Sequence, residues 1–143
     1  MIMLETNIDN MNPEIYSYLF PKLLDNKALD VFVTPITMKK NRPANILSVL
    51  CHEEMVEKME EIIFTETTTL GIRKYMVERE ELQRELKKVV TRFGEVTVKF
   101  AYRNGKPLKF APEYEECRRI AETVHLPLIQ VISEIIAEVE KIK

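Results

Sequence analysis

A chain of 143 residues with 45% hydrophobic and 31% charged residues has the composition of an ordinary globular protein, which excludes a disordered or low-complexity chain. Its formal net charge of −2 argues against bulk attraction to nucleic acid or to a membrane surface. No apolar run reaches transmembrane length, no signal-peptide pattern opens the chain, and the two cysteines form no CxxC pair, so we expect reduced thiols in a cytoplasmic protein.

The first 79 residues alternate between strand and helix patterns. Residues 2–9 alternate apolar and polar side chains, as a half-buried strand does, and Asn12-Pro13 is a typical helix start. Pro21 should kink that helix or end it early. In chain order we predict strand 2–8, helix 13–25, strand 31–38, a basic loop 39–43, strand 46–51, a helix around 55–63 that ends in the threonine-rich segment 65–71, and strand 72–79.

This β-α-β-β-α-β order predicts an α+β protein that begins with a ferredoxin-like unit over residues 1–79. With right-handed crossovers, the first two strands run parallel and the third and fourth run against them. Three segments that are distant in sequence should therefore meet at one edge of the sheet: residues 5–14, residues 39–43 and residues 66–73.

Residues 80–143 predict a second unit, made of a β-hairpin and two C-terminal helices, that serves packing or oligomerisation. Asn104-Gly105 is a strong signal for a tight turn between strands. The expected elements are a hairpin around Phe93-Gly94 whose first strand extends back over residues 80–88, a short strand 106–110, and helices that open at Pro112 and Pro127.

Three carboxylates lie where the first strand passes into the first helix. Glu5, Asp9 and Glu14 could bind Mg²⁺ or Mn²⁺, which prefer oxygen ligands and often bind through phosphates. The alternative is a solvated strand face with one carboxylate placed favourably at a helix N-terminus.

Basic and hydroxyl side chains occupy the other two segments, although no glycine-rich phosphate loop is present. Candidate partners of a phosphate chain are Lys39, Lys40, Arg42, Thr67, Thr68, Thr69 and Arg73. Taken separately, these residues could also be a basic hairpin tip and the end of a helix. Their predicted meeting with carboxylates favours a metal–triphosphate, whose two parts need partners of opposite charge.

The cysteines and histidines carry weaker indications. Cys117, near the start of a predicted helix, could be a metal ligand with a lowered pKa, but it also fits the apolar stripe of that helix as a structural residue. Cys51 fits a core strand, and His52 and His125 have no partner at metal-ligand spacing.

Four motifs in a fixed order carry a resemblance to a known family: ETNIDNMNPE, MKKNRP, ETTTLGIR and APEYEECRRIAE. They resemble the C-terminal domain of the nickel-insertion (LarC) family, which completes the nickel-pincer nucleotide cofactor of lactate racemase. The resemblance covers essentially the whole chain. Because the family's full-length proteins are longer, it implies that the N-terminal part of the same protein is a partner.

The resemblance implies a CTP- and divalent-metal-binding domain of a cyclometallase, or nickel chelatase, of the lyase class. That enzyme inserts nickel into pyridinium-3,5-bisthiocarboxylic acid mononucleotide and consumes CTP with Mn²⁺ or Mg²⁺. Nickel is the inserted substrate ion, the domain alone is not expected to suffice for activity, and a homo-oligomer is expected.

Carried over by position, the resemblance implies a role for most of the candidate residues. Asp9, Asn10 and Glu14 would lie near the metal, with Asn10 standing where the family usually has Asp. The nucleotide-binding set is Lys39, Lys40, Arg42, Thr67, Thr68, Thr69 and Arg73. We assign no role to Glu113, Tyr114 and Cys117, which belong to the fourth motif.

Two other classes of function remain to be compared. The ferredoxin-like unit could be a non-catalytic ligand-sensing or oligomerisation module, with Ile129, Ile136 and Ile142 on the last helix packing against another subunit. RNA binding is disfavoured by the near-neutral charge and by the lack of an aromatic pair on a central strand.

Overall fold

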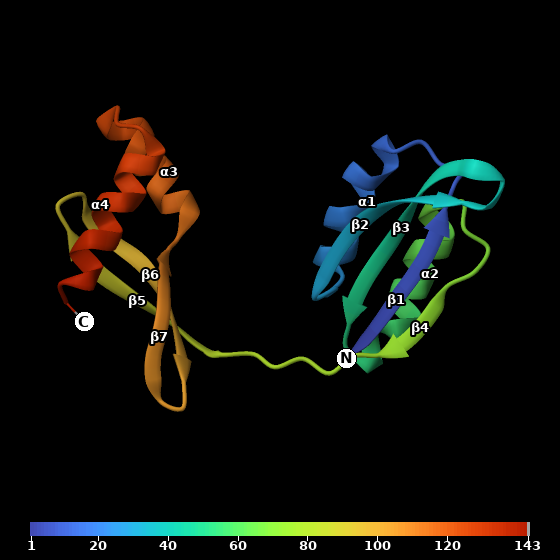
Figure 1. The fold of residues 1–143 in the computed structure, drawn as a ribbon, viewed down its shortest axis with the longest axis horizontal. Helices are drawn as coiled ribbons and strands as arrows, with labels where there is room; N and C mark the ends of the chain where they lie inside the picture. The colour runs from blue at the N-terminus through green and yellow to red at the C-terminus, as the bar shows by residue number, and fades with distance from the viewer. Residues whose placement is uncertain (143) are drawn as a thin grey trace. The chain divides into compact units, whose positions relative to one another are not determined.

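The computed structural model describes residues 1–142 and divides the chain into two compact units, Met1–Arg79 and the part from Glu80 onward (Figure 1). The first unit contains β1 (Ile2–Ile8), α1 (Glu14–Asp25), β2 (Asp30–Met38), β3 (Arg42–Cys51), α2 (Val56–Glu66) and β4 (Arg73–Met76). Short 3₁₀ turns at Lys39–Asn41 and Glu53–Met55 connect neighbouring elements.

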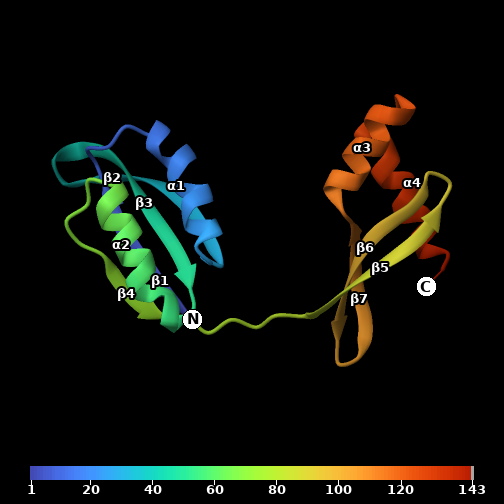
Figure 2. The same cartoon turned by 180° about the vertical axis from the view of Figure 1, so that it is seen from behind.

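The four strands of the first unit form one antiparallel sheet in the order β2-β3-β1-β4. Both α1 and α2 cover the same face of this sheet, as Figures 1 and 2 show from opposite sides. The predicted ferredoxin-like arrangement is therefore confirmed. The core between the helices and the sheet contains Leu4, Ile8, Leu19, Leu23, Leu47, Val49, Met59, Ile62 and Ile63.

Alternation along β1 decides which of its side chains face the core. Leu4, Thr6 and Ile8 are at most 3% exposed, whereas the side chains between them point to the sheet face that carries no helix. Burial of Leu4 and Ile8 contributes about 1.5–3 kcal/mol each. A polar hydroxyl at Thr6 is therefore the exception on an otherwise apolar face.

The first helix ends at Asp25, as predicted, and Pro21 does not end it early, because Leu19 and Leu23 on either side of the proline are both fully buried in the core. Two other predicted boundaries in the first unit were wrong. The basic loop is shorter than predicted, since Arg42 already pairs with Met38 across the β2–β3 hairpin. The fourth strand stops at Met76 because it pairs only with the first half of β1.

The second unit contains β5 (Gln83–Thr91), β6 (Gly94–Arg103), β7 (Lys106–Pro112), α3 (Tyr114–Val124) and α4 (Leu128–Glu140). Its three strands form an antiparallel sheet in chain order, and both helices contribute to the apolar core, which includes Val96, Val98, Cys117, Val131 and Ile135.

Pro112 does not open a helix as predicted. It pairs with Val98 as the last residue of β7, and Glu113 follows in extended backbone before α3 begins. The Glu113 N–H donates to the Thr97 carbonyl at 2.9 Å, which carries the sheet pairing one residue further.

Among residues 1–142, no single helix is both long and apolar enough to cross a bilayer. Only α3 and α4 taken together reach that length and composition, with a bend of 117° between them.

Candidate functional site

Three segments of the first unit meet beyond one end of its sheet, where β1 and β2 end and β4 begins (Figure 1). The acidic segment is Asp9-Asn10, the basic turn is Lys39–Asn41 with Arg42, and the threonine loop is Thr67–Gly71. Direct contacts tie the acidic segment to both of the others. The Thr68 hydroxyl donates to Asn10 Oδ1 at 2.7 Å, and Arg42 Nη1 lies 3.4 Å from Asp9 Oδ2.

The Arg42–Asp9 ion pair joins the basic and acidic segments without burying either charge. The two side chains are 55% and 24% exposed, and an ion pair this open contributes only about 0–1 kcal/mol. A ligand that brings phosphates to Arg42 and a cation to Asp9 can therefore replace the pair at little energetic cost.

The basic turn projects two further cations into solvent. Lys39 and Lys40 are both exposed, and Lys40 has a left-handed backbone conformation, with φ 62° and ψ 22°. Asn41 follows with φ 58°. Lysine pays a steric cost in this region, so its presence between the two strands requires a compensating role or tolerance of strain.

The threonine loop uses two of its three hydroxyls to hold its own shape. Thr67 Oγ1 donates to the Ile63 carbonyl at 2.7 Å at the end of α2, and it accepts from the Thr69 N–H at 3.2 Å. Thr69 Oγ1 donates to the Gly71 carbonyl at 3.0 Å. The side chain of Thr68 is exposed and points to Asn10.

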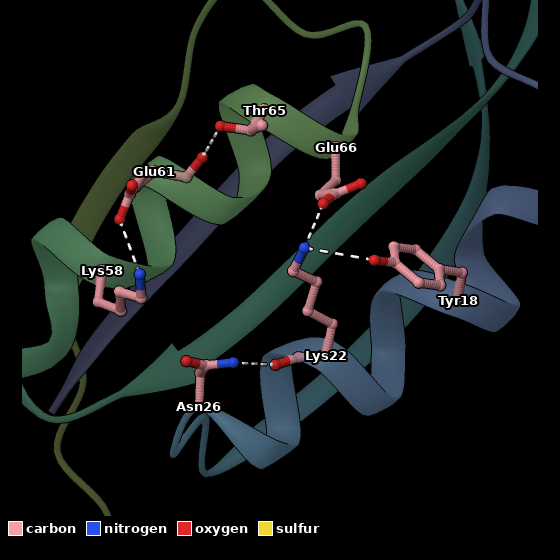
Figure 3. A network of polar contacts seen from close by, with 7 residues as sticks. All are labelled: Tyr18, Lys22, Asn26, Lys58, Glu61, Thr65 and Glu66. Carbon is pink, nitrogen blue, oxygen red and sulfur yellow. Dashed lines mark hydrogen bonds and ion pairs between the residues drawn. The ribbon is translucent and has the colours of Figure 1, made fainter.

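An ion pair between the two helices fixes the start of this loop (Figure 3). The Lys22 ammonium group of α1 contacts the Glu66 carboxylate, the last residue of α2, and also lies 3.4 Å from the Tyr18 hydroxyl. These bonds, with the Glu66 bond the largest cause, raise the pKa of Lys22. Since Thr67 follows Glu66 directly, the pair sets where the loop leaves the helix.

Arg73 lies on the open face of the sheet rather than beside the basic turn. Its Nε is 3.3 Å from Glu5 Oε2, and its Nη2 donates to Asn7 Oδ1 at 2.7 Å. Ser48 on β3 donates to the same Glu5 carboxylate at 3.2 Å. Sequence reasoning missed Ser48 as a partner of Glu5, because only the strand register places it opposite. Asn7 lies on the same strand face as Glu5, but its bond to Arg73 depends on the pairing of β1 with β4.

Glu14 begins α1, and its N–H donates to Asn12 Oδ1 at 3.0 Å, so Asn12 provides the capping interaction that the sequence predicts for it. The Glu14 carboxylate is exposed, and within residues 1–142 no hydrogen bond joins it to Asp9 or Asn10, which pair with Arg42 and Thr68 instead. In the same range, no group of three or more His, Cys, Asp and Glu side chains is placed to hold a metal ion.

The residues of the fourth motif lie in the second unit and play local roles. Cys117 is fully buried, and burial raises the pKa of its thiol, which fits a structural residue rather than a thiolate ligand. Burial raises the pKa of the Cys51 thiol in the same way. Glu113 forms an ion pair with Lys99 at 3.1 Å, and Tyr114 is exposed.

Two cavities among the described residues lie elsewhere. One of about 760 Å³ is lined by residues around the β6–β7 turn, and one of about 500 Å³ lies beside β4. The three segments gather instead on an exposed edge, a shape that suits a highly charged ligand more than an apolar one.

Comparison with known proteins shows which family the chain resembles over most of its length. The family model described as nickel insertion protein matches residues 1–132. The chain is 52% identical over 129 residues to the pyridinium-3,5-bisthiocarboxylic acid mononucleotide nickel insertion protein of Clostridium acetobutylicum, covering 90% of this chain and 31% of that protein. It is 39% identical over 142 residues to the protein of the same name from Thermotoga petrophila, covering 99% and 36%. The chain thus spans about a third of the length of these curated relatives.

Two solved structures share the fold. One is described as LarC2, the C-terminal domain of a cyclometallase involved in the synthesis of the NPN cofactor of lactate racemase, in its apo form. It matches with a TM-score of 0.92 and 37% identity, over 97% of this chain and 96% of that chain. The other, protein MK0293 from Methanopyrus kandleri, has a TM-score of 0.70 at 24% identity, over 92% and 81%, and supports the fold alone.

Proposed function

The chain belongs to the nickel insertion protein family, and from this premise we propose that it is the CTP- and divalent-metal-binding C-terminal domain of a larger enzyme. That enzyme inserts nickel into pyridinium-3,5-bisthiocarboxylic acid mononucleotide, the substrate named for the relatives. Family membership, as the sequence motifs predict, is confirmed, and the match to a C-terminal domain agrees with the position that they imply. The use of CTP is our proposal.

The observation that carries the proposal is the meeting of carboxylate, amide, ammonium, guanidinium and hydroxyl groups at one exposed edge. Asp9 and Asn10 contact Arg42 and Thr68 directly, although the three segments are separated by more than twenty residues each. A metal–triphosphate needs oxygen ligands for its cation and cationic or hydroxyl donors for its phosphates. This edge offers both kinds of group side by side.

We assign the phosphates to Lys39, Lys40 and Arg42, with Thr68 as the exposed hydroxyl of the threonine loop. The cation is proposed to arrive already bound to CTP, since residues 1–142 present no cluster of three acidic, His or Cys side chains for a metal alone. Asp9 and Asn10 then supply oxygen atoms beside it, and Glu14 adds negative charge at the start of α1. Arg73 contributes to the nucleotide site from the open sheet face.

Nickel chemistry is proposed to depend on the remainder of the protein. Nickel in an organometallic cofactor precursor is a substrate, and soft ligands suit it. The two thiols of this chain are buried, with their pKa values raised by burial, and therefore unsuited to transfer a metal. We therefore place the lyase reaction in the full-length enzyme. We also propose that this enzyme works in the cytoplasm, without nucleic acid or membrane partners.

Titration calorimetry on the purified chain tests the proposal directly. We expect binding of CTP with Mn²⁺, and weaker binding of ATP with Mn²⁺ because a purine differs in size and hydrogen-bonding pattern. Absence of any binding, or equal binding of the two nucleotides, would contradict the assignment.

A second candidate function is a ligand-sensing or oligomerisation module without a catalytic role. This alternative is supported by exposed apolar side chains in the second unit, where Ile129 is 80%, Val90 75% and Leu86 60% exposed. Sedimentation analysis separates the two: an oligomer that forms normally and ignores every nucleotide and metal favours this alternative. Oligomer formation by itself is compatible with both.

A further inference from the structure

We propose that Thr6 is a positioning residue of the nucleotide site, which fixes the threonine loop so that Thr68 meets the ligand. The inference rests on the proposed function for its ligand, and on the hydrogen bonds of Thr6 for its geometry. Thr6 itself is 2% exposed and lies beneath the site rather than in it.

A triangle of oxygen atoms links the buried Thr6 of β1 to the half-buried Thr69 and the exposed Gly71 of the threonine loop. Thr6 Oγ1 donates to the Gly71 carbonyl at 2.8 Å and contacts Thr69 Oγ1. Thr69 Oγ1 lies 3.0 Å from the same carbonyl. Either hydroxyl can donate to the other while its partner donates to Gly71, so three oxygen atoms share two hydrogens. The hydroxyl of Thr6 thereby connects residues that are 63 and 65 positions away in sequence.

The position of Thr6 indicates that the hydroxyl, rather than the shape, matters. Its neighbours on the inward face of β1, Leu4 and Ile8, are apolar and buried. Valine has nearly the same shape as threonine and a high strand propensity, so packing and local preference alone would favour an apolar residue here. Within residues 1–142, the buried hydroxyl of Thr6 finds its hydrogen-bond partners in the loop, at Thr69 and Gly71.

The triangle also assigns different tasks to the three threonines of the loop. Thr67 Oγ1 is engaged with the Ile63 carbonyl and the Thr69 N–H, and Thr69 Oγ1 is engaged with Thr6 and Gly71. Thr68 alone among the three presents an exposed side chain at the loop surface. Thr6 and Thr69 thus hold the loop from below, and Thr68 faces the ligand.

The test compares three variants by calorimetry with CTP and Mn²⁺: Thr6→Val, Thr6→Ser and Val49→Ala. Thr6→Val should weaken binding by about tenfold, because the loop loses its hydrogen bond to the Thr6 hydroxyl. Thr6→Ser restores the hydroxyl and should stay within about threefold of wild type. Val49→Ala opens a cavity in the same core, and is expected to lower Tm at least as much as Thr6→Val while leaving affinity unchanged.

Hydrogen exchange without any ligand gives an independent readout. In Thr6→Val, amides of residues 67–73 should exchange faster than in wild type, whereas Val49→Ala should show no selective change there. Wild-type affinity in Thr6→Val, or unchanged exchange in the loop, overturns this inference. Failure of the wild-type chain to bind CTP with Mn²⁺ overturns the proposed function instead, and the exchange result then still decides whether Thr6 anchors the loop.

Discussion

Two hairpin turns of this protein have related backbones and similar charge but different surroundings. Lys40 and Asn41 join β2 to β3 with φ values of 62° and 58°, and Asn104 and Gly105 join β6 to β7 with φ values of 52° and 75°. Asparagine and glycine enter the left-handed region easily, whereas lysine is held there at a cost of about 1 kcal/mol. The turn in the second unit is therefore built for stability.

Both turns are also basic, since Arg103 and Lys106 flank the second one. In the first unit, Arg42 beside the turn contacts Asp9, and the next residue, Asn10, accepts a hydrogen bond from Thr68. Charge on a turn thus says little about function. A strained backbone next to a contact between opposite charges is a stronger indication of a binding site, and the turn at Lys40 has both.

The largest expected effect comes from removing the lysines of the first turn. Lys39→Ala/Lys40→Ala should weaken binding of CTP with Mn²⁺ by at least about a hundredfold, since each of the two charge-assisted contacts contributes about 1.5–3 kcal/mol. Binding of a nucleoside monophosphate should change far less. Calorimetry on the matched variant Arg103→Ala/Lys106→Ala should give wild-type affinity. A similar loss in both variants would mean that general charge, rather than this site, governs binding.

A smaller effect is expected when a lysine is placed in the left-handed backbone of the second turn, as it is in the first. Gly105→Lys should lower the free energy of unfolding by about 1–2 kcal/mol, because a side chain is disfavoured at φ 75°. Open space around the added Cβ leaves the backbone as the main source of the loss. Urea unfolding measures the change, and affinity for CTP should be unaffected. Unchanged stability would contradict the claim that this turn depends on glycine.

The reverse exchange should separate stability from binding in the first turn. Lys40→Asn is expected to raise the free energy of unfolding by up to about 1 kcal/mol, since asparagine tolerates the left-handed region. It should weaken triphosphate binding at the same time, because a cation is lost. Thermal unfolding and calorimetry on the same sample test the pair of outcomes. A variant that is both less stable and binds normally would refute the interpretation of Lys40.

The smallest expected effect is a pH-dependent one, confined to the second unit. The Thr97 backbone N–H and hydroxyl donate to Glu116 at 2.6 and 2.8 Å and lower the pKa of its carboxyl group. Because the pKa of Glu116 is lower in the folded chain than its unfolded value of about 4.3, the ionised carboxylate stabilises the folded state at pH values above about 4.3. This contribution is lost as the pH falls through the folded-state pKa. Glu116→Gln should therefore lower Tm slightly at pH 7 and make little difference at strongly acid pH. An equal effect at both pH values would exclude ionisation as the cause.

Much of the fold could be predicted because local patterns and topology agree. The alternation along β1 and the Asn104-Gly105 turn signal are local, and the handedness of crossovers supplied the strand directions. Strand ends were harder to place, since they depend on partners. Arg42 looks like part of a basic loop in sequence, but pairing with Met38 draws it into β3.

The candidate site could be predicted as a set of segments but not as a set of contacts. Topology sufficed to bring Asp9, Arg42 and Thr68 to one edge. It could not show that Arg73 is engaged with Glu5 and Asn7, because that depends on the register between β1 and β4. Nucleotide roles for these residues stay predictions.

The two-sided character of β1 has a consequence for how this protein can vary in length. One inserted or deleted residue within Ile2–Ile8 would exchange the faces of the strand residues beyond it, exposing core side chains and turning outward residues such as Glu5 and Asn7 toward the core. Gaps in related sequences should therefore avoid this strand, and gain or loss of residues should concentrate in surface loops instead. An insertion scan read out by expression would reveal β1 as an intolerant interval.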